Sequence, residues 1–126
     1  MIITLDLAGD VPIYQQIRDS VVAAIAQGKL REGDPLPSVR QLAVDIGVNM
    51  HTVNKAYALL KADGYLSIDR RSGARISERL LLDDAVRARI FENLNAAAIE
   101  AYSRGMTESE FLTLCESAFD QLKEEA

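Results

Sequence analysis

Residues 39–57 read VRQLAVDIGVNMHTVNKAY, and this stretch decides the fold. Apolar residues recur at helical spacing on both sides of Gly47; they are Leu42, Ala43 and Ile46 before it, and Val53, Ala56, Tyr57 and Leu60 after it. Glycine tolerates the left-handed backbone that a tight turn between two helices needs. The small residue Ala43 and the apolar Val48 stand on either side of this turn. The spacing therefore predicts a helix-turn-helix.

The second of these helices begins with mostly polar residues, which point away from its apolar face. They are Asn49, Met50, His51, Thr52, Asn54 and Lys55. A helix that exposes such a face is expected to contact another molecule. An ordinary surface helix in a small α-hairpin is the alternative that this stretch leaves open.

Length and composition favour a single domain with at most a small appendage, because the chain has 126 residues. No apolar run approaches the ~20 residues of a membrane span, and no basic start precedes an apolar segment as in a signal peptide. We therefore predict a cytoplasmic protein. The single cysteine, Cys115, lies on an apolar helical stripe, where core packing is expected rather than redox sensing.

The net charge of −5 is unevenly distributed. Residues 1–79 carry ten Lys and Arg against nine Asp and Glu, whereas residues 80–126 carry four against ten. The overall acidity therefore hides a local excess of positive charge in residues 40–75. A basic face on an acidic body is compatible with binding to nucleic acid.

The segments before the helix-turn-helix are predicted as an N-terminal strand or ordered arm, a helix and a loop. Residues 1–7 are rich in β-formers. Apolar residues then recur at helical spacing between Pro12, which suits a first helical turn, and Gly28, which ends the helix. Residues 29–37 contain a Gly-Asp turn and two prolines, and are expected to form a loop.

Helix caps and a hairpin surround the helix-turn-helix. Ser38 and Gln41 have the spacing of a capping box, and Asn49 can cap the second helix, which should end near Asp63-Gly64. Residues 65–69 then alternate as a strand, 70–73 form a turn, and 74–77 form a return strand. A hairpin directly after a helix-turn-helix is a wing.

Residues from 79 onward predict two long amphipathic helices. Gly105 separates them, and Thr107 with Glu110 forms a second capping box. Their apolar stripes are too broad for solvated helices, so a second copy of the chain is the expected partner. The predicted dimer residues are Val86, Ile90, Phe91, Leu94, Phe111, Leu114, Ala118 and Leu122.

The expected fold class is mainly α with a small β-wing (α+β). A winged helix-turn-helix DNA-binding domain is predicted over residues 1–78, and a two-helix dimerisation region over residues 79–126.

The chain resembles the GntR family of bacterial winged-helix transcription regulators over about residues 10–77. The resemblance rests on PIYQQI (12–17), GDPLPSVRQLA (33–43), GVN (47–49), TVNKAY (52–57) and GYL (64–66). The short C-terminal part is similar to that of the YtrA-type subfamily, whose appended region is two dimerisation helices.

The resemblance implies DNA contacts from the first motif helix, from the start of the second and from the wing tip. The corresponding residues here are Arg40, Asn49, Met50, His51, Thr52, Asn54 and Gly73. The wing departs from the usual family pattern at residues 71, 72, 74 and 75, and Met50 replaces a frequent basic or polar residue. The base preference is therefore not implied.

Side-chain chemistry adds roles to these positions. Asn49 or Asn54 can pair with adenine and Arg40 with guanine, although Asn49 is equally suited to capping the helix. Lys55 suits a phosphate. Arg70 and Arg71 suit the minor groove or the DNA backbone, with a plain charged hairpin as the alternative. His51 has no second metal ligand at suitable spacing, so we expect it to contact DNA or solvent and not a metal ion.

The sequence thus predicts a homodimeric repressor that binds an inverted-repeat operator. A winged helix used for protein–protein contact is the alternative. No nucleophile–base pair, phosphate loop or metal spacing is present, so neither an enzyme nor a cofactor is expected. A small-molecule effector between the C-terminal helices is left open.

Overall fold

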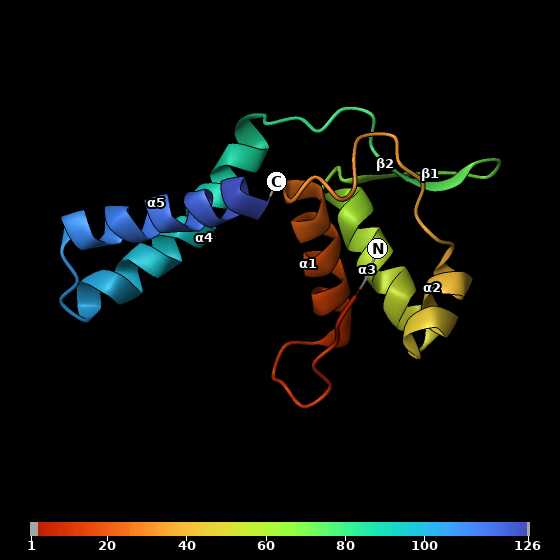
Figure 1. Ribbon diagram of the computed structural model, residues 1–126, viewed down its shortest axis with the longest axis horizontal. Coiled ribbons are helices and arrows are strands. Elements are labelled where there is room, and N and C mark those ends of the chain that lie inside the picture. The colour runs from red at the N-terminus through yellow and green to blue at the C-terminus, as the bar shows by residue number, and fades with distance from the viewer. Residues whose placement is uncertain (1–2, 126) are drawn as a thin grey trace. The chain divides into compact units, whose positions relative to one another are not determined.

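The computed structural model describes residues 3–125 and has the mainly helical fold with a small β-wing that the sequence predicts (Figure 1). The elements are α1 (Ile13–Ala26), α2 (Val39–Ile46), α3 (Met50–Ala62), β1 (Leu66–Asp69), β2 (Gly73–Ile76), α4 (Asp84–Ser103) and α5 (Glu108–Glu125). They form two compact units, one ending at Leu80 and the other beginning at Leu81. Within the described residues, no helix combines the length and the apolar character needed to cross a bilayer.

The core of the first unit is built around α3, which packs against α1, α2 and β1 (Figure 1). The predicted apolar faces are buried here, with Val53, Ala56 and Leu60 inaccessible to solvent. The other buried residues of the core cluster are Ile17, Val21, Leu36, Leu42, Ala43, Tyr57, Leu66, Ala74 and Ile76. Each large aliphatic side chain buried in this way contributes about 1.5–3 kcal/mol relative to its exposed state.

The turn between α2 and α3 has the conformation that its glycine predicts. Gly47 has φ 70° and ψ 37°, and the backbone N–H of Val48 donates to the Ala43 carbonyl. The predicted capping box at the start of α2 is only half present. The Ser38 hydroxyl accepts from the Gln41 N–H at 3.1 Å, but the Gln41 side chain donates forward to Asp45 at 2.7 Å. The Gln41 amide is therefore directed toward Asp45, one turn further along the same helix face, and does not accept from the Ser38 N–H.

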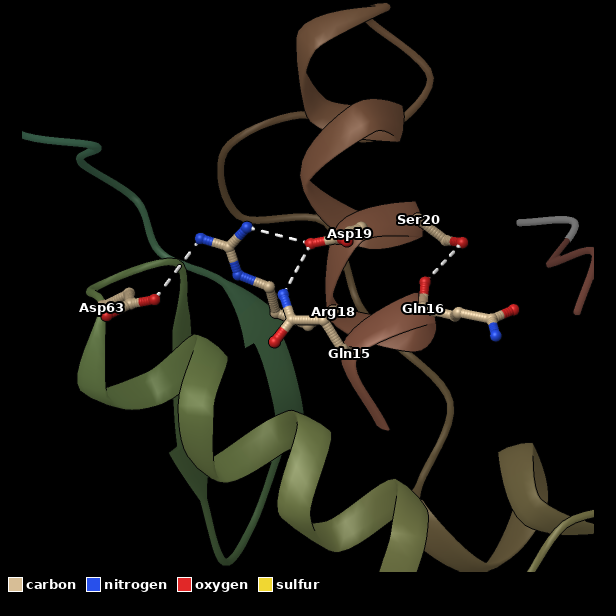
Figure 2. A network of polar contacts seen from close by, with 6 residues as sticks. All are labelled: Gln15, Gln16, Arg18, Asp19, Ser20 and Asp63. Carbon is tan, nitrogen blue, oxygen red and sulfur yellow. Dashed lines mark hydrogen bonds and ion pairs between the residues drawn. The ribbon is translucent and has the colours of Figure 1, made fainter. Parts of the chain in front are cut away.

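A polar network joins α1 to the C-terminal end of α3 (Figure 2). The Arg18 guanidinium contacts the carboxylates of Asp19 at 3.2 Å and Asp63 at 3.4 Å. Its carbon Cζ also lies 5.8 Å from the centre of the Tyr65 ring. The charge of Arg18 is therefore compensated within the fold.

The wing is an antiparallel pair in which Leu66 faces Ile76 and Asp69 faces Gly73. The return strand begins one residue earlier than predicted. Ile68, predicted to alternate with polar neighbours, is 49% exposed, although its cross-strand partner Ala74 is buried.

Part of the predicted loop over residues 29–37 pairs with the outer side of β2. The Gly33 N–H donates to the Ile76 carbonyl, the Ile76 N–H to the Asp34 carbonyl, and the Leu36 N–H to the Ala74 carbonyl. These hydrogen bonds place Leu36 in the core and pair the edge of β2 that does not face β1.

The N-terminal segment is an ordered arm rather than an edge strand over its described part, residues 3–11. The Gln16 side chain accepts from the Asp6 N–H and donates to the carbonyls of Asp6 and Val11. Ile3 and Leu5 pack against the core. Residues 1–2, on which the prediction of a strand also falls, lie outside the described residues. Pro12 immediately precedes α1 instead of lying in its first turn.

The second unit contains α4 and α5. Asp83 caps α4 through the Val86 N–H, and the predicted capping box of α5 is complete, since Thr107 and Glu110 each accept from the backbone N–H of the other. The hydrogen bonds from the N–H and hydroxyl of Thr107 lower the pKa of Glu110. Cys115 is half-buried rather than a core residue. No residue of α4 is buried, so this unit has little core of its own.

Candidate nucleic-acid interface

The N-terminal half of α3 presents an exposed face opposite its buried residues. This recognition face consists of the side chains of Met50, His51, Asn54 and Lys55. It follows from the helical period, because Val53, Ala56 and Tyr57 turn their side chains into the core. The α-hairpin alternative is wrong, since α2 and α3 are followed by a paired wing.

Asn49 and Thr52, both predicted to contact DNA, are less available for it than the other residues at the start of α3. The Asn49 Oδ1 accepts from the His51 N–H at 2.7 Å, so Asn49 caps α3. A bidentate contact from Asn49 to adenine would need the same oxygen. Asn54 is exposed and makes no hydrogen bond to another described residue, and is therefore better placed for that contact. Thr52 is half-buried.

Arg40 lies in the first turn of α2 and is exposed. Its guanidinium has no ion pair or hydrogen bond among residues 3–125. A free guanidinium presents a planar set of donors that matches guanine or a phosphate.

The acids near these cations are all occupied locally. Asp45 accepts from Gln41, Asp63 binds Arg18, and Asp69 accepts from the Arg71 backbone N–H at 2.9 Å. Across the described chain, none of them pairs with Arg40 or Lys55. Arg40 and Lys55 therefore form no ion pair within the described chain.

The wing tip adds two more cations. Arg70 and Arg71 are exposed, and within the described part their side chains make no ion pair. Gly73 has φ 73°, a conformation that lets the chain enter β2 directly from the turn. Arg75 instead donates from Nη1 to the Gly33 carbonyl at 3.1 Å. It braces the wing.

A contact between α1 and the recognition face has no local sequence signal. The Lys55 ammonium nitrogen lies 4.0 Å from the centre of the Tyr14 ring. Tyr14 is in the first turn of α1 and is half-buried against the core. The two residues are far apart in sequence, so only the packing of α1 on α3 reveals the pair.

The predicted dimer residues lie on largely exposed surface in the second unit. Ile90, Phe91 and Leu94 are 53%, 63% and 43% exposed, while Val86 and Phe111 are half-buried. Leu114, Ala118 and Leu122 are also exposed, and so are three apolar residues that were not predicted for this surface, namely Ile99, Leu112 and Phe119.

A largely apolar pocket of about 490 Å³ opens between α4 and α5, next to their connecting turn. Its apolar lining includes Ala97, Ala101 and Phe111. Its charged groups are engaged within the chain, since Arg104 lies 3.6 Å from Glu100 and Glu110 accepts from Thr107. Within residues 3–125, no group of three His, Cys, Asp or Glu side chains is arranged to hold a metal ion.

Residues 13–76, which span the whole first-unit core except its N-terminal arm, match the family described as bacterial regulatory proteins, gntR family. The HTH-type transcriptional repressor YtrA of Bacillus subtilis (strain 168) is 36% identical over 106 residues, which cover 82% of each chain.

Two solved structures share the fold over nearly the whole length. A transcriptional antiterminator from Listeria monocytogenes EGD-e matches 97% of this chain and 92% of its own, with a TM-score of 0.87 and 25% identity. YtrA from Sulfolobus acidocaldarius, a GntR-family transcription factor, matches 96% of this chain and 99% of its own, with a TM-score of 0.61 and 33% identity.

Proposed function

Because the chain belongs to the GntR family of bacterial regulatory proteins, we propose that it is a homodimeric repressor that binds an operator with inverted half-sites. The family and its YtrA-type relatives make it a DNA-binding transcription regulator and not an enzyme. The homodimer, the inverted operator and repression are the steps that we add, together with a cytoplasmic location, where the DNA of a bacterium lies.

The observation that carries DNA reading is the recognition face of α3. It is polar and exposed, and its lysine makes no ion pair within the described chain, while the opposite face of the same helix is buried. In a helix-turn-helix, the N-terminal part of the second helix enters the major groove. We assign base contacts to Asn54, Met50 and His51.

The remaining cations of the first unit surround this face with phosphate contacts. Lys55 and Arg40 flank the groove, and Arg70 and Arg71 with Gly73 carry the wing onto the backbone or into the minor groove. Asn49 caps the start of α3, and the half-buried Thr52 follows in its first turn.

Dimerisation is supported by the apolar surface of α4 and α5. Monomers rarely expose contiguous apolar patches larger than a few hundred Å², and neither helix buries its stripe within one chain. A second α4–α5 hairpin would cover both stripes as in a four-helix bundle, and its side chains would fill the pocket next to the turn. Repression is supported by the name of the Bacillus subtilis relative.

Selection of bound duplexes from a random DNA pool tests the proposal directly. We expect an enriched sequence with two inverted half-sites, about one helical turn or a multiple of it apart. Failure to enrich any sequence, together with binding that does not weaken as salt is raised, would contradict DNA reading and favour the protein–protein alternative.

Arg40 provides a sharper test on the selected duplex. Replacing Arg40 with Ala should weaken binding by about 1–3 kcal/mol with little change in stability, since the side chain is exposed. Arg40→Lys separates a contact to phosphate from a contact to guanine. Lysine keeps the charge that a phosphate attracts but loses the bidentate geometry that guanine requires. An Arg40→Ala protein that binds the duplex as tightly as the parent would remove Arg40 from the interface.

A further inference from the structure

We propose that Tyr14 is a positioning residue for DNA binding, because its ring holds the Lys55 ammonium where a phosphate meets it. The proposal rests on the proposed function, which places Lys55 at the DNA backbone. Tyr14 lies outside the helix-turn-helix, on α1, and acts through Lys55 without touching a base.

The contact has the geometry of a cation–π interaction. The ammonium nitrogen is 4.0 Å from the ring centre, well inside the ~6 Å over which a ring face attracts a cation. Lys55 is an exposed residue, and its ammonium forms no ion pair within the described chain. A phosphate oxygen can approach the ammonium while the ring contact persists.

An aromatic ring differs from a carboxylate in what it does to the charge. A carboxylate neutralises a lysine, as Asp19 and Asp63 neutralise Arg18 (Figure 2). The ring attracts the ammonium through its quadrupole and leaves the full positive charge in place. Lys55 has no acidic partner among residues 3–125. It is therefore oriented without being compensated.

Orientation matters because lysine is one of the side chains with the most rotamer freedom. A free lysine loses that freedom when it binds a phosphate, whereas a lysine already held by a ring has lost part of it on folding. Preorganisation of this kind strengthens binding without adding a contact. We expect the ring to be worth about two- to fivefold in affinity for each half-site.

The Tyr14 hydroxyl makes no hydrogen bond to another described residue, so the ring alone carries the proposed role. Tyr14→Phe should therefore bind the selected duplex like the parent. Tyr14→Leu should bind about four- to twenty-fivefold more weakly across two half-sites. Fluorinated phenylalanines at position 14 should weaken binding step by step, because each fluorine withdraws electron density from the ring face at nearly constant shape.

The test is a double-mutant cycle on the selected duplex, measured over a range of salt concentrations. Lys55→Ala should lower the salt dependence by about one counterion per half-site. Tyr14→Leu should then have no further effect in the Lys55→Ala background. A full Tyr14→Leu effect in that background would overturn the proposal.

Tyr65→Leu is the matched control. It also removes a ring beside a cation, but Arg18 is already ion-paired with two carboxylates. It should change the unfolding midpoint and leave DNA affinity and its salt dependence unaltered. Loss of DNA affinity equal to that of Tyr14→Leu would show that the effect is one of general packing.

Two readouts separate failure of this inference from failure of the proposed function. In the DNA-free protein, the Lys55 side-chain protons should show an upfield ring-current shift in NMR spectra, and Tyr14→Leu should abolish it. Absence of that shift, or unchanged affinity of Lys55→Ala, overturns the role of Tyr14 while parent binding to the selected duplex upholds the proposed function. Absence of parent binding to any duplex overturns both.

Discussion

At the scale of single residues, Tyr57 ties the recognition helix to the segment before α2. Its side chain is 1% exposed, and its hydroxyl donates to the Pro37 carbonyl at 2.7 Å. Burial raises the pKa of Tyr57 to about 12. The hydrogen bond and the raised pKa together keep the hydroxyl protonated in the folded protein.

This pKa predicts a loss of stability at high pH. Below about pH 10, the folded and unfolded chains both keep the proton. Between about pH 10 and 12 the unfolded chain releases it while the folded chain does not, so the free energy of unfolding falls, by about 2–3 kcal/mol in all. Tyr57→Phe should cost about 1 kcal/mol at pH 7 and lack this fall.

Denaturant unfolding of both proteins at pH 7 and at several values above 10 checks the prediction. Tyr102→Phe is the control, since Tyr102 is 86% exposed. A constant difference between parent and Tyr57→Phe across the range would show that Tyr57 ionises normally.

At the scale of elements, Gly47 determines how α3 leaves α2. Its φ is 70°, and an added Cβ would meet no atom within 4 Å, so the Cβ itself fits and the cost of a substitution comes from the left-handed backbone. Gly47→Val should therefore lower the free energy of unfolding by more than about 1 kcal/mol.

Gly47→Asn is the matched variant, because asparagine tolerates the left-handed region better than a β-branched residue. Thermal unfolding should rank the parent first, Gly47→Asn second and Gly47→Val last. Equal midpoints for all three would mean that the turn does not depend on this conformation.

The helices, the turn and the wing could be predicted from sequence because their signals are local. Gly47 and the spacing of Val53, Ala56 and Leu60 specify the helix-turn-helix within one stretch. The pairing of residues 33–36 with β2 could not be predicted, since Pro35 and Pro37 suppress the strand signal.

For the candidate site too, the sequence predicts local features but not contacts between distant residues. Helical period alone places Asn54 and Lys55 on an exposed face. It does not show that Arg75 is bound to the Gly33 carbonyl or that Lys55 lies on Tyr14, because both contacts join residues about 40 positions apart. Asn49 remained ambiguous because one amide suits both a cap and an adenine.

At the scale of the whole molecule, the apolar stripe of α4 predicts a test of the dimer. Leu94 is 43% exposed in one chain, so Leu94→Asp should leave the first unit intact. If the stripe packs against a second copy, the same change places a charge in the interface, which costs several kcal/mol.

Sedimentation equilibrium should therefore find Leu94→Asp monomeric at concentrations where the parent is a dimer. Ala96→Asp adds the same charge to the same helix at an exposed position off the stripe, and should stay dimeric. An intact Leu94→Asp dimer would place the interface elsewhere.

The division of the chain into two units predicts what truncation does to DNA binding. A chain ending at Leu80 keeps the whole core of the first unit, which lies within residues 17–76, and the Leu80 N–H that donates to Glu32. It should fold, with a cooperative thermal transition. It should bind a single half-site as the parent does, because the recognition face and the wing are unchanged.

On the full operator, the same truncated chain should bind about a hundredfold or more weakly. In a dimer the second half-site contact is intramolecular, and linking two modest contacts raises avidity by about 10²–10⁴ without any new interaction. Fusing residues 1–80 to an unrelated dimeric coiled coil should restore much of the affinity if α4 and α5 act only by pairing two chains. Titration of both proteins on operators with one and with two half-sites measures each step. Equal affinity of the truncated monomer and the parent for the two-site operator would show that dimerisation is not how this regulator reads DNA.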